Sequence, residues 1–261
     1  QGKIQLPLLE CMDIDYCIID KDTDNFNHVV KKLVKKATLN SKPVALLVRK
    51  KTFQKYNFVG ENDISISSLI SREKALEILL DFIPSDTVVV STTGKTSREI
   101  FEIRDKINRN HKQDFLTVGS MGHASSIALG IAISNPDKKV VCIDGDGAFL
   151  MHLGNLSTIS KINPNNFYHI LINNQVHDSV GGQETSIKYL DIKNLVKSHN
   201  YNKVLSVVNE KEISSFIPEF LNCKGMNFLE IKVKPGSRKS LGRPTIKPKD
   251  NKIHFMNFIK E

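Results

Sequence analysis

The sequence has few cysteines and no long apolar run. Its four cysteines are Cys11, Cys17, Cys142 and Cys223, and none of them forms a CxxC pair. This usage argues against a disulfide framework and a zinc site, and it favours a reducing compartment. No apolar stretch approaches the roughly 20 residues that a bilayer-spanning helix needs. We therefore predict a cytoplasmic protein that makes no contact with a membrane.

The amino terminus also lacks two common features. The first ten residues, QGKIQLPLLE, have no charged leader feeding a long apolar stretch, so they are not a signal peptide. There is no initiator methionine, which suggests that residues upstream are missing. At 261 residues with 40% hydrophobic content, the chain is too long for one average domain and short for two full ones.

Acidic residues are absent between Asp24 and Glu61, and they are scarce after Ile231, where nine Lys and Arg stand against two acids. The net charge is +9. Basic runs are typical of nucleic-acid binding. A groove that binds single-stranded nucleic acid needs aromatic residues between its basic ones, and these runs do not have that pattern. We therefore interpret the runs as a solvated face that attracts small anions, and we expect no nucleic-acid partner.

The most informative stretch is Lys139–Thr185. An apolar run, Val140–Ile143, predicts a buried strand and is followed by Asp144-Gly145-Asp146-Gly147. One helical pattern then continues through Phe149, Leu150, Leu153, Leu156 and Ile159. A second strand, Tyr168–Ile172, delivers Asn173-Asn174. This is a βαβ unit, and ligands of open α/β sheets bind beyond the carboxyl ends of such strands.

Asp146 and Asn174 should therefore face one crevice. We expect Gly145 and Gly147 to let the backbone turn sharply and approach a ligand. The following helix offers free N–H groups and a positive dipole end to a diphosphate. Carboxylate and amide oxygens are hard ligands that suit Mg²⁺.

Strands alternate with helices throughout, which predicts an α/β fold with a doubly wound, mainly parallel sheet. We expect Asp24 or Asn25 to cap a helix that ends at Asn40 and Ser71 to cap one that ends at Leu80. The buried stripe of the first of these helices should be Val29, Val30, Leu33, Val34 and Ala37. Other predicted helices are Gln5–Met12, Thr96–Lys106, His123–Ile133, Ile187–Ser198, Glu212–Asn222 and Lys252–Ile259. Other predicted strands are Asp15–Ile19, Pro43–Val48, Asp86–Val90, Phe115–Val118, Lys203–Val208 and Asn227–Val233.

The sequence GDG, then a run of between twenty and thirty residues, then NN resembles the cofactor motif of thiamine diphosphate-dependent enzymes. Three stretches resemble the phosphonopyruvate decarboxylases in particular, with the sulfopyruvate decarboxylases as close cousins. They are TTGKTSREIFE (Thr92–Glu102), GSMGHASSIALGIA (Gly119–Ala132) and NNQVHDSVGGQET (Asn173–Thr185).

The resemblance implies thiamine diphosphate and Mg²⁺ as cofactors. It implies that Asp146, Asn174 and the main-chain carbonyl of Val176 hold the metal. The implied cofactor-binding residues are Thr93, Gly94, Ser120, Met121, Gly122, Gly145, Gly147 and Ala148. His177 is a candidate general acid, although a hydrogen bond to Asp178 that fixes the loop is an equal alternative. His123 is a second catalytic candidate, although a histidine at a helix start is more often a cap or a packing residue.

The resemblance also implies a domain division. Residues 1–55 would be the carboxyl-terminal part of a pyrimidine-binding domain, 56–70 a linker and 71–261 the diphosphate-binding domain with its tail. The glutamate that activates the cofactor in this family has no match between Gln1 and Val48. We therefore expect an amino-truncated fragment of an enzyme that forms a homo-oligomer at full length.

The implied reaction is decarboxylation of 3-phosphonopyruvate to phosphonoacetaldehyde and CO₂, a step in phosphonate (2-aminoethylphosphonate) biosynthesis. Arg238, Arg243 and Lys95 are candidates for binding the anionic substrate. The alternatives are a sulfopyruvate decarboxylase and a catalytically silent thiamine diphosphate-binding module. A plain nucleotide-binding protein is less favoured, because neither GxGxxG nor a complete GxxxxGK[ST] loop is present.

Overall fold

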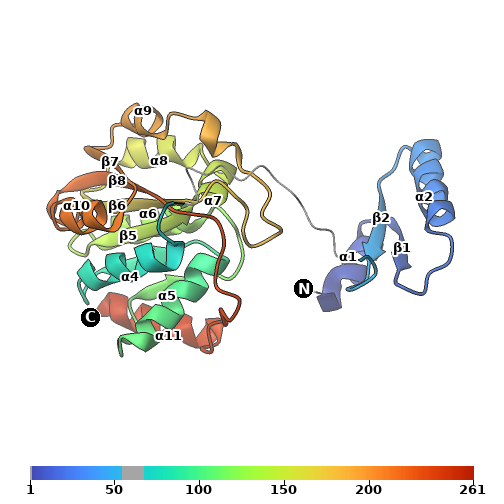
Figure 1. Cartoon of the computed structure of the whole chain (residues 1–261), viewed down its shortest axis with the longest axis horizontal. Helices are drawn as coiled ribbons and strands as arrows, with labels where there is room; N and C mark the ends of the chain where they lie inside the picture. The colour runs from blue at the N-terminus through green and yellow to red at the C-terminus, as the bar shows by residue number, and fades with distance from the viewer. Residues whose placement is uncertain (1, 55–67) are drawn as a thin grey trace. The chain divides into compact units, whose positions relative to one another are not determined.

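The computed structural model describes residues 2–54 and 68–261. The chain divides into two compact units, Gln1–Glu61 and Asn62–Glu261, which are labelled by element in Figure 1. The predicted linker, residues 56–70, lies almost entirely outside the described residues. The assignment of the two units to pyrimidine-binding and diphosphate-binding domains stays a prediction.

The first unit is a parallel βαβ arrangement. Strand β1 (Asp15–Ile19) pairs in parallel with β2 (Val44–Val48), and α2 (Phe26–Asn40) connects them. A short helix, α1 (Gln5–Cys11), follows a 3₁₀ turn, η1 (Gly2–Ile4). The side chain of Asn25, and not that of Asp24, caps α2, because its Oδ1 accepts from the N–H of His28 at 3.1 Å.

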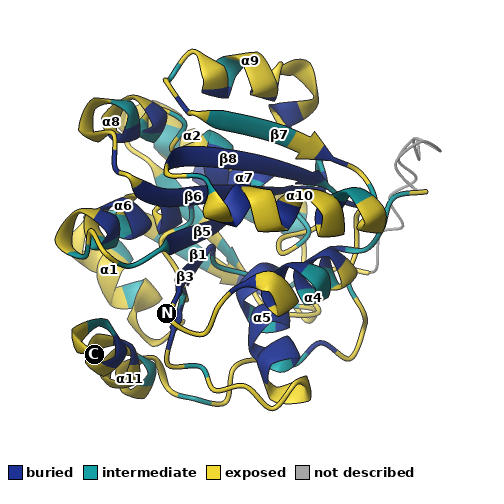
Figure 2. Cartoon of the chain, turned by 90° about the vertical axis from the view of Figure 1, so that its left-hand side faces the viewer, coloured by how far each residue is buried: buried dark blue, intermediate teal, exposed yellow. Residues whose placement is uncertain are grey.

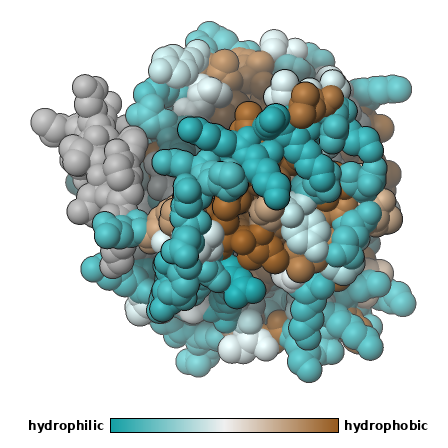
Figure 3. All heavy atoms as spheres, turned by 90° about the vertical axis from the view of Figure 1, so that its right-hand side faces the viewer, coloured by the Kyte–Doolittle hydropathy of each residue, from teal (hydrophilic) through white to brown (hydrophobic). Residues whose placement is uncertain are grey.

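The prediction of a buried stripe on α2 is wrong for most of its members. Leu33 is buried, but Val30 and Val34 are 41% and 58% exposed. Val29 and Ala37 are half-buried, and β2 is also partly exposed along its length. Two strands offer a helix only a narrow surface, so part of the stripe has nothing to pack against within this unit. Figure 3 shows apolar side chains gathered at the surface among hydrophilic ones.

The second unit contains a six-stranded, wholly parallel sheet in the order β4-β3-β5-β6-β8-β7. Its strands are β3 (Val88–Ser91), β4 (Asp114–Leu116), β5 (Val140–Gly145), β6 (Asn166–Asn173), β7 (Lys203–Val207) and β8 (Gly225–Lys232). Its helices are α4 (Arg72–Phe82), α5 (Lys95–Lys106), α6 (Ala124–Ser134), α7 (Asp146–Met151), α8 (Asn155–Ile162), α9 (Ile192–Lys197), α10 (Glu210–Asn222) and α11 (Pro248–Lys260), with a 3₁₀ turn η2 (Ser186–Tyr189).

Helices cover both faces of this sheet, so the predicted doubly wound α/β fold is confirmed. Apolar side chains of α4, α5 and α10 pack on one face. Those of α6, α8, α9 and α11 pack on the other. Figure 2 shows the central strands in the buried colour, between helices whose outer sides are exposed. Ser71 caps α4 as predicted, accepting from the N–H of Lys74 at 3.1 Å.

Two predicted helices are wrong in extent. The single helix expected from the Phe149–Ile159 pattern is broken at His152–Gly154 into α7 and α8. At the start of α8, the Asn155 side chain donates to Ser125 of α6 at 2.9 Å, which fixes the new helix direction. The helix expected near 187–198 is likewise η2 followed by α9, with Asp191 as the α9 cap.

The strand order places a ligand crevice at one edge of the sheet. The chain leaves β3 toward β4 on one side and returns to β5 on the other, so β3 and β5 flank a topological switch point. The residues just beyond β3, β5 and β6 therefore meet at the carboxyl edge. Within the described residues, no helix has the length and apolar character to cross a bilayer.

Candidate active site

A cavity of about 250 Å³ lies at the carboxyl ends of β3, β5 and β6. Most of the predicted site residues line it: Thr93, Gly94, Lys95, Met121, Gly145, Asp146, Gly147, Ala148, Asn174, Val176 and His177. Three segments far apart in sequence thus converge on one space, as expected for a switch-point crevice.

Ser120, Gly122 and His123 do not line this cavity. Gly122 packs against α7, because a Cβ there would lie 2.3 Å from the His152 ring and 2.9 Å from the Ala148 carbonyl oxygen. His123 is exposed, with Nδ1 3.2 Å from the carbonyl oxygen of Ser120 and its ring 4.2 Å from that of His152. The geometry therefore favours a packing role for His123 over the predicted catalytic one.

Asp146 is the first residue of α7 and is only 3% exposed. Its Oδ2 accepts from the Thr185 hydroxyl at 2.5 Å. Burial raises the pKa of this carboxyl to about 6, against the lowering effect of the hydrogen bonds from Thr185 and the backbone. Asn174 is 4% exposed at the end of β6 and lines the same cavity.

The glycines of the GDG sequence act differently from the prediction. The chain does not turn sharply at Gly145, whose backbone is extended at φ −107° and ψ 155°. Gly147 is required for another reason: a Cβ there would lie 2.5 Å from Cε1 and Nδ1 of His177. The absence of a side chain at Gly147 thus lets the His177 ring approach the start of α7.

The loop after β6 folds back on itself. The N–H of His177 donates to the Gln183 carbonyl at 2.8 Å, and the N–H of Thr185 donates to that of Gln175 at 2.8 Å. Gln175 has a positive φ of 61° at the start of this turn. The fold-back returns Thr185 to Asp146 and leaves His177 beside Gly147.

Sequence reasoning missed several residues here. Thr92 lines the cavity, and its hydroxyl is buried and has no hydrogen-bond partner among the described residues. Arg72 also lines it and joins Glu99 and Asp178 in a buried ion-pair network. The partners of Arg72 lie 27 and 106 residues away, so no local pattern could have indicated them. Asp178 is held by this network and not by His177.

These residues fit a metal-bound diphosphate. Asp146, Asn174 and Val176 offer the hard oxygen ligands that Mg²⁺ prefers. The orphaned Thr92 hydroxyl and the amino-terminal end of α5 at Lys95 are suited to diphosphate oxygens. Burial of both Asp146 and Asn174 means that a cation between them would be largely shielded from water.

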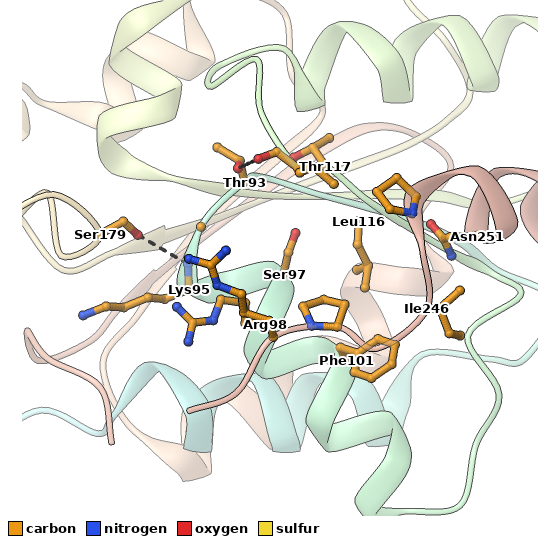
Figure 4. Close-up of a pocket in the computed structure, with 15 residues that line it drawn as sticks. Thr93, Lys95, Ser97, Arg98, Phe101, Leu116, Thr117, Ser179, Ile246 and Asn251 are labelled. Atoms are coloured by element: carbon orange, nitrogen blue, oxygen red, sulfur yellow. Dashed lines mark hydrogen bonds between the residues drawn. The ribbon is translucent and has the colours of Figure 1, made fainter. Parts of the chain in front are cut away.

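A second cavity, of about 440 Å³, adjoins the first and shares Thr93, Gly94, Lys95 and Ser179 with it (Figure 4). Lys95, Arg98 and Arg243 line it, and no carboxylate of the described residues does. The Arg98 guanidinium donates to the Leu241 and Gly242 carbonyls. These bonds fix the tail, the segment between β8 and α11, beside the cavity.

Arg238 lies elsewhere, and this is a correction to the predicted set of substrate-binding cations. Its Nε donates to Glu73 at 2.8 Å, and its Nη2 pairs with Glu102. Two carboxylates neutralise the guanidinium, so it is not free to bind an anion.

Comparison with known protein families shows which family the chain belongs to. Residues 93–231 match the family described as "Thiamine pyrophosphate enzyme, C-terminal TPP binding domain". The chain belongs to the thiamine pyrophosphate enzymes. The matched range begins just after β3, and it includes β4 to β7 completely and β8 up to its penultimate residue. It therefore contains the carboxyl ends of β5 and β6, which form two sides of the first cavity.

Two groups of thiamine pyrophosphate enzymes are similar over most of the chain. The phosphonopyruvate decarboxylase of Streptomyces viridochromogenes is 37% identical over 189 residues, which is 72% of this chain and 46% of that protein. The sulfopyruvate decarboxylase subunit beta of Methanococcus maripaludis is 32% identical over 192 residues, 74% of this chain and 99% of that subunit. The chain thus spans about half the length of the curated phosphonopyruvate decarboxylases it matches.

A solved structure from Mycobacterium smegmatis, described as a thiamin diphosphate-dependent enzyme, supports the fold. It matches with a TM-score of 0.54 and 19% identity, covering 65% of this chain and 32% of that one. This likeness confirms the thiamine diphosphate-binding fold predicted from the sequence.

Proposed function

We propose that this chain provides the diphosphate- and metal-binding half of a decarboxylase that acts on 3-phosphonopyruvate. The observation that carries the proposal is the convergence of buried Asp146 and Asn174 with Thr92, whose buried hydroxyl has no partner among the described residues, on one cavity. Asp146, Asn174 and Val176 would hold Mg²⁺, and Thr92 with the α5 amino terminus would bind the diphosphate. When bound, thiamine diphosphate supplies the electron sink that decarboxylation of a 2-oxo acid requires.

His177 is the proposed proton donor. Its ring lines the cavity and is held against Gly147 and beside the predicted metal ligand Asp146. A ring nitrogen there can deliver a proton to the substrate carbon after CO₂ has left. The fold-back of the 174–185 loop fixes the backbone of His177, so the ring needs no hydrogen bond to Asp178 to stay in place.

Lys95 and Arg243 are the proposed anion-binding residues. Both line the second cavity, and neither forms an ion pair with any described residue. Their free charges suit the phosphonate group. A sulfonate is also a tetrahedral anion on a pyruvate, so sulfopyruvate is the alternative substrate. The phosphonate is favoured because 37% identity extends over 189 residues for a phosphonopyruvate decarboxylase, whereas for a sulfopyruvate decarboxylase subunit beta it extends over 136 residues.

An apolar rim supports a covering partner. Val118 and Val180 line the two cavities, yet they are 74% and 73% exposed. Exposed apolar side chains at a site mouth are typical of surfaces that another domain or subunit buries. We propose that a pyrimidine-binding domain, in a homo-oligomer or a two-subunit assembly, covers this rim.

The test measures CO₂ release from phosphonopyruvate and from sulfopyruvate with Mg²⁺ and thiamine diphosphate. The chain is assayed alone and mixed with a separately expressed pyrimidine-binding domain of a relative. We expect release only from the mixture and faster release from phosphonopyruvate. Absence of metal-dependent cofactor binding by the chain, or no release from either substrate in the mixture, would contradict the proposal.

A further inference from the structure

A buried network leads from α4 to the predicted metal ligand Asn174. Arg72 donates through Nε and Nη2 to Glu99 at 2.6 and 2.9 Å, and through Nη1 to Asp178 at 2.9 Å. Asn174 Nδ2 donates to the same Asp178 oxygen at 2.8 Å. The side chains of Arg72, Glu99 and Asp178 are 5%, 1% and 11% exposed. None of these three residues has a role in the metal site as proposed above.

Within the described part of the chain, Asp178 accepts hydrogen bonds from three residues. Besides Arg72 and Asn174, the N–H of Gly236 lies 3.1 Å from each of its carboxylate oxygens. A carboxylate only accepts, whereas a side-chain amide has one donating end and one accepting end. Asn174 must therefore turn its nitrogen toward Asp178 and its oxygen away from it. On that other side Oδ1 accepts from the N–H of Val176 at 3.3 Å.

The orientation of this amide matters for a metal. Mg²⁺ binds an amide through its oxygen, and the NH₂ group has no free lone pair to offer. An Asn174 side chain with its ends exchanged would present two N–H bonds to the cation. The Asp178 carboxylate, together with the longer contact from the Val176 N–H, thus favours the orientation in which Asn174 can be a ligand.

We infer that Asp178, held in place by Arg72, is a positioning residue that keeps the Asn174 amide oxygen directed to the metal. The inference rests on the proposed function. Glu99 holds the Arg72 guanidinium by two parallel bonds, so Arg72 cannot swing away from Asp178. Gly236, in a turn with φ 104°, holds Asp178 from the tail. Three segments outside the GDG and NN sequences thereby support the amide orientation that the Val176 N–H also favours.

A merely structural network would behave differently. It would join α4, α5, the 174–185 loop and the tail, and its loss would lower the melting temperature without a specific effect on metal affinity. The test therefore measures Mg²⁺-dependent thiamine diphosphate binding of the folded 261-residue chain by calorimetry. Melting temperatures are recorded separately for each variant.

Removal of the acceptor is the first arm. Asp178→Ala should weaken Mg²⁺-dependent binding by about 10- to 100-fold, the usual effect of losing a group that orients a metal ligand. Asp178→Asn keeps one oxygen that can accept from Asn174, so it should retain most of the affinity. Asp191→Ala is a matched control, because the exposed Asp191 accepts from the Asn194 amide at 2.7 Å at the start of α9 and does not line the cavity. It should leave binding unchanged.

A rescue at position 174 is the second arm. Asn174→Asp offers an oxygen in either orientation, so in the Asp178→Ala background it should restore affinity. With Asp178 present, the same change puts two carboxylates together and should not improve binding. Equal effects of Asn174→Asp in both backgrounds, or wild-type affinity of Asp178→Ala, would overturn the inference. If the unchanged chain shows no Mg²⁺-dependent binding, the proposed function fails, and the inference fails with it.

Discussion

The imidazole of His177 lies directly against the α-carbon of Gly147. A methyl group at position 147 would stand 2.5 Å from two ring atoms of His177 and 3.1 Å from Cε of Met121. The first contact is shorter than real Cβ atoms make, so any side chain at position 147 would require the His177 ring to move.

Gly147→Ala should therefore displace the His177 ring and slow product formation by roughly 100-fold or more, the lower end of what a positioned proton donor contributes. His177→Gln should slow it similarly and affect cofactor binding much less. The double variant should be no slower than either single variant. Gly145→Ala is the control, because a Cβ there meets only Thr92 Cγ2 at 3.7 Å, an ordinary contact. If the two rate losses multiplied in the double variant, the effect of Gly147→Ala would not act through His177.

Asp146→Ala should abolish Mg²⁺-dependent binding of thiamine diphosphate. A lost anionic ligand to a small cation cannot be replaced by water. The fold should stay intact, because desolvation already disfavours the buried carboxylate. Calorimetry gives the affinity and a thermal melt gives the stability. Unchanged affinity would remove Asp146 from the metal site.

Thr185→Val should make binding more sensitive to acid. The Thr185 hydroxyl lowers the pKa of Asp146, which is about 6, and its loss should raise that pKa because the charged carboxylate loses a hydrogen bond. A higher pKa leaves more of the carboxyl protonated near pH 6.5, and a protonated carboxyl binds Mg²⁺ poorly. Metal-dependent binding should fall several-fold relative to wild type at pH 6.5 and recover at pH 8. A loss of equal size at both pH values would refute this explanation.

Arg243→Gln should raise KM for the substrate by about 10-fold, because a charge-assisted hydrogen bond contributes about 1.5 kcal/mol or more. Cofactor affinity should not change. Arg238→Gln is the matched control on the same tail: its guanidinium is committed to Glu73 and Glu102, so KM should stay as in wild type. Steady-state kinetics on both variants decide the assignment. A larger KM effect from Arg238→Gln would reverse it.

The sequence predicts the strands well, and it predicts that Asp146 and Asn174 line one cavity, because both depend on short-range patterns. Runs such as Val140–Ile143 form buried parallel strands, and Asp146 and Asn174 follow strand ends at one edge of the sheet. Caps are also local, so Asn25 and Ser71 could be identified from a few residues.

Features that depend on tertiary contacts could not be predicted. The break between α7 and α8 does not disturb the apolar spacing, and the contact that fixes it comes from Ser125 on α6. The exposure of Val34 depends on how little sheet lies beneath α2. The Arg72 network joins residues separated by 27 and 106 positions, and nothing in the neighbourhood of Arg72 indicates that it is buried.

The 174–185 loop is fastened to the site at both of its ends. It begins at Asn174, a proposed metal ligand, and it ends at Thr185, which donates to Asp146, a second proposed ligand. Release of either end removes support from the other, so the loop should open as one cooperative segment. A ligand that binds only the closed form reduces the frequency of such opening. The amide protons of His177 and Thr185, which close the fold-back, should therefore exchange with solvent together and slow down together when metal and diphosphate bind.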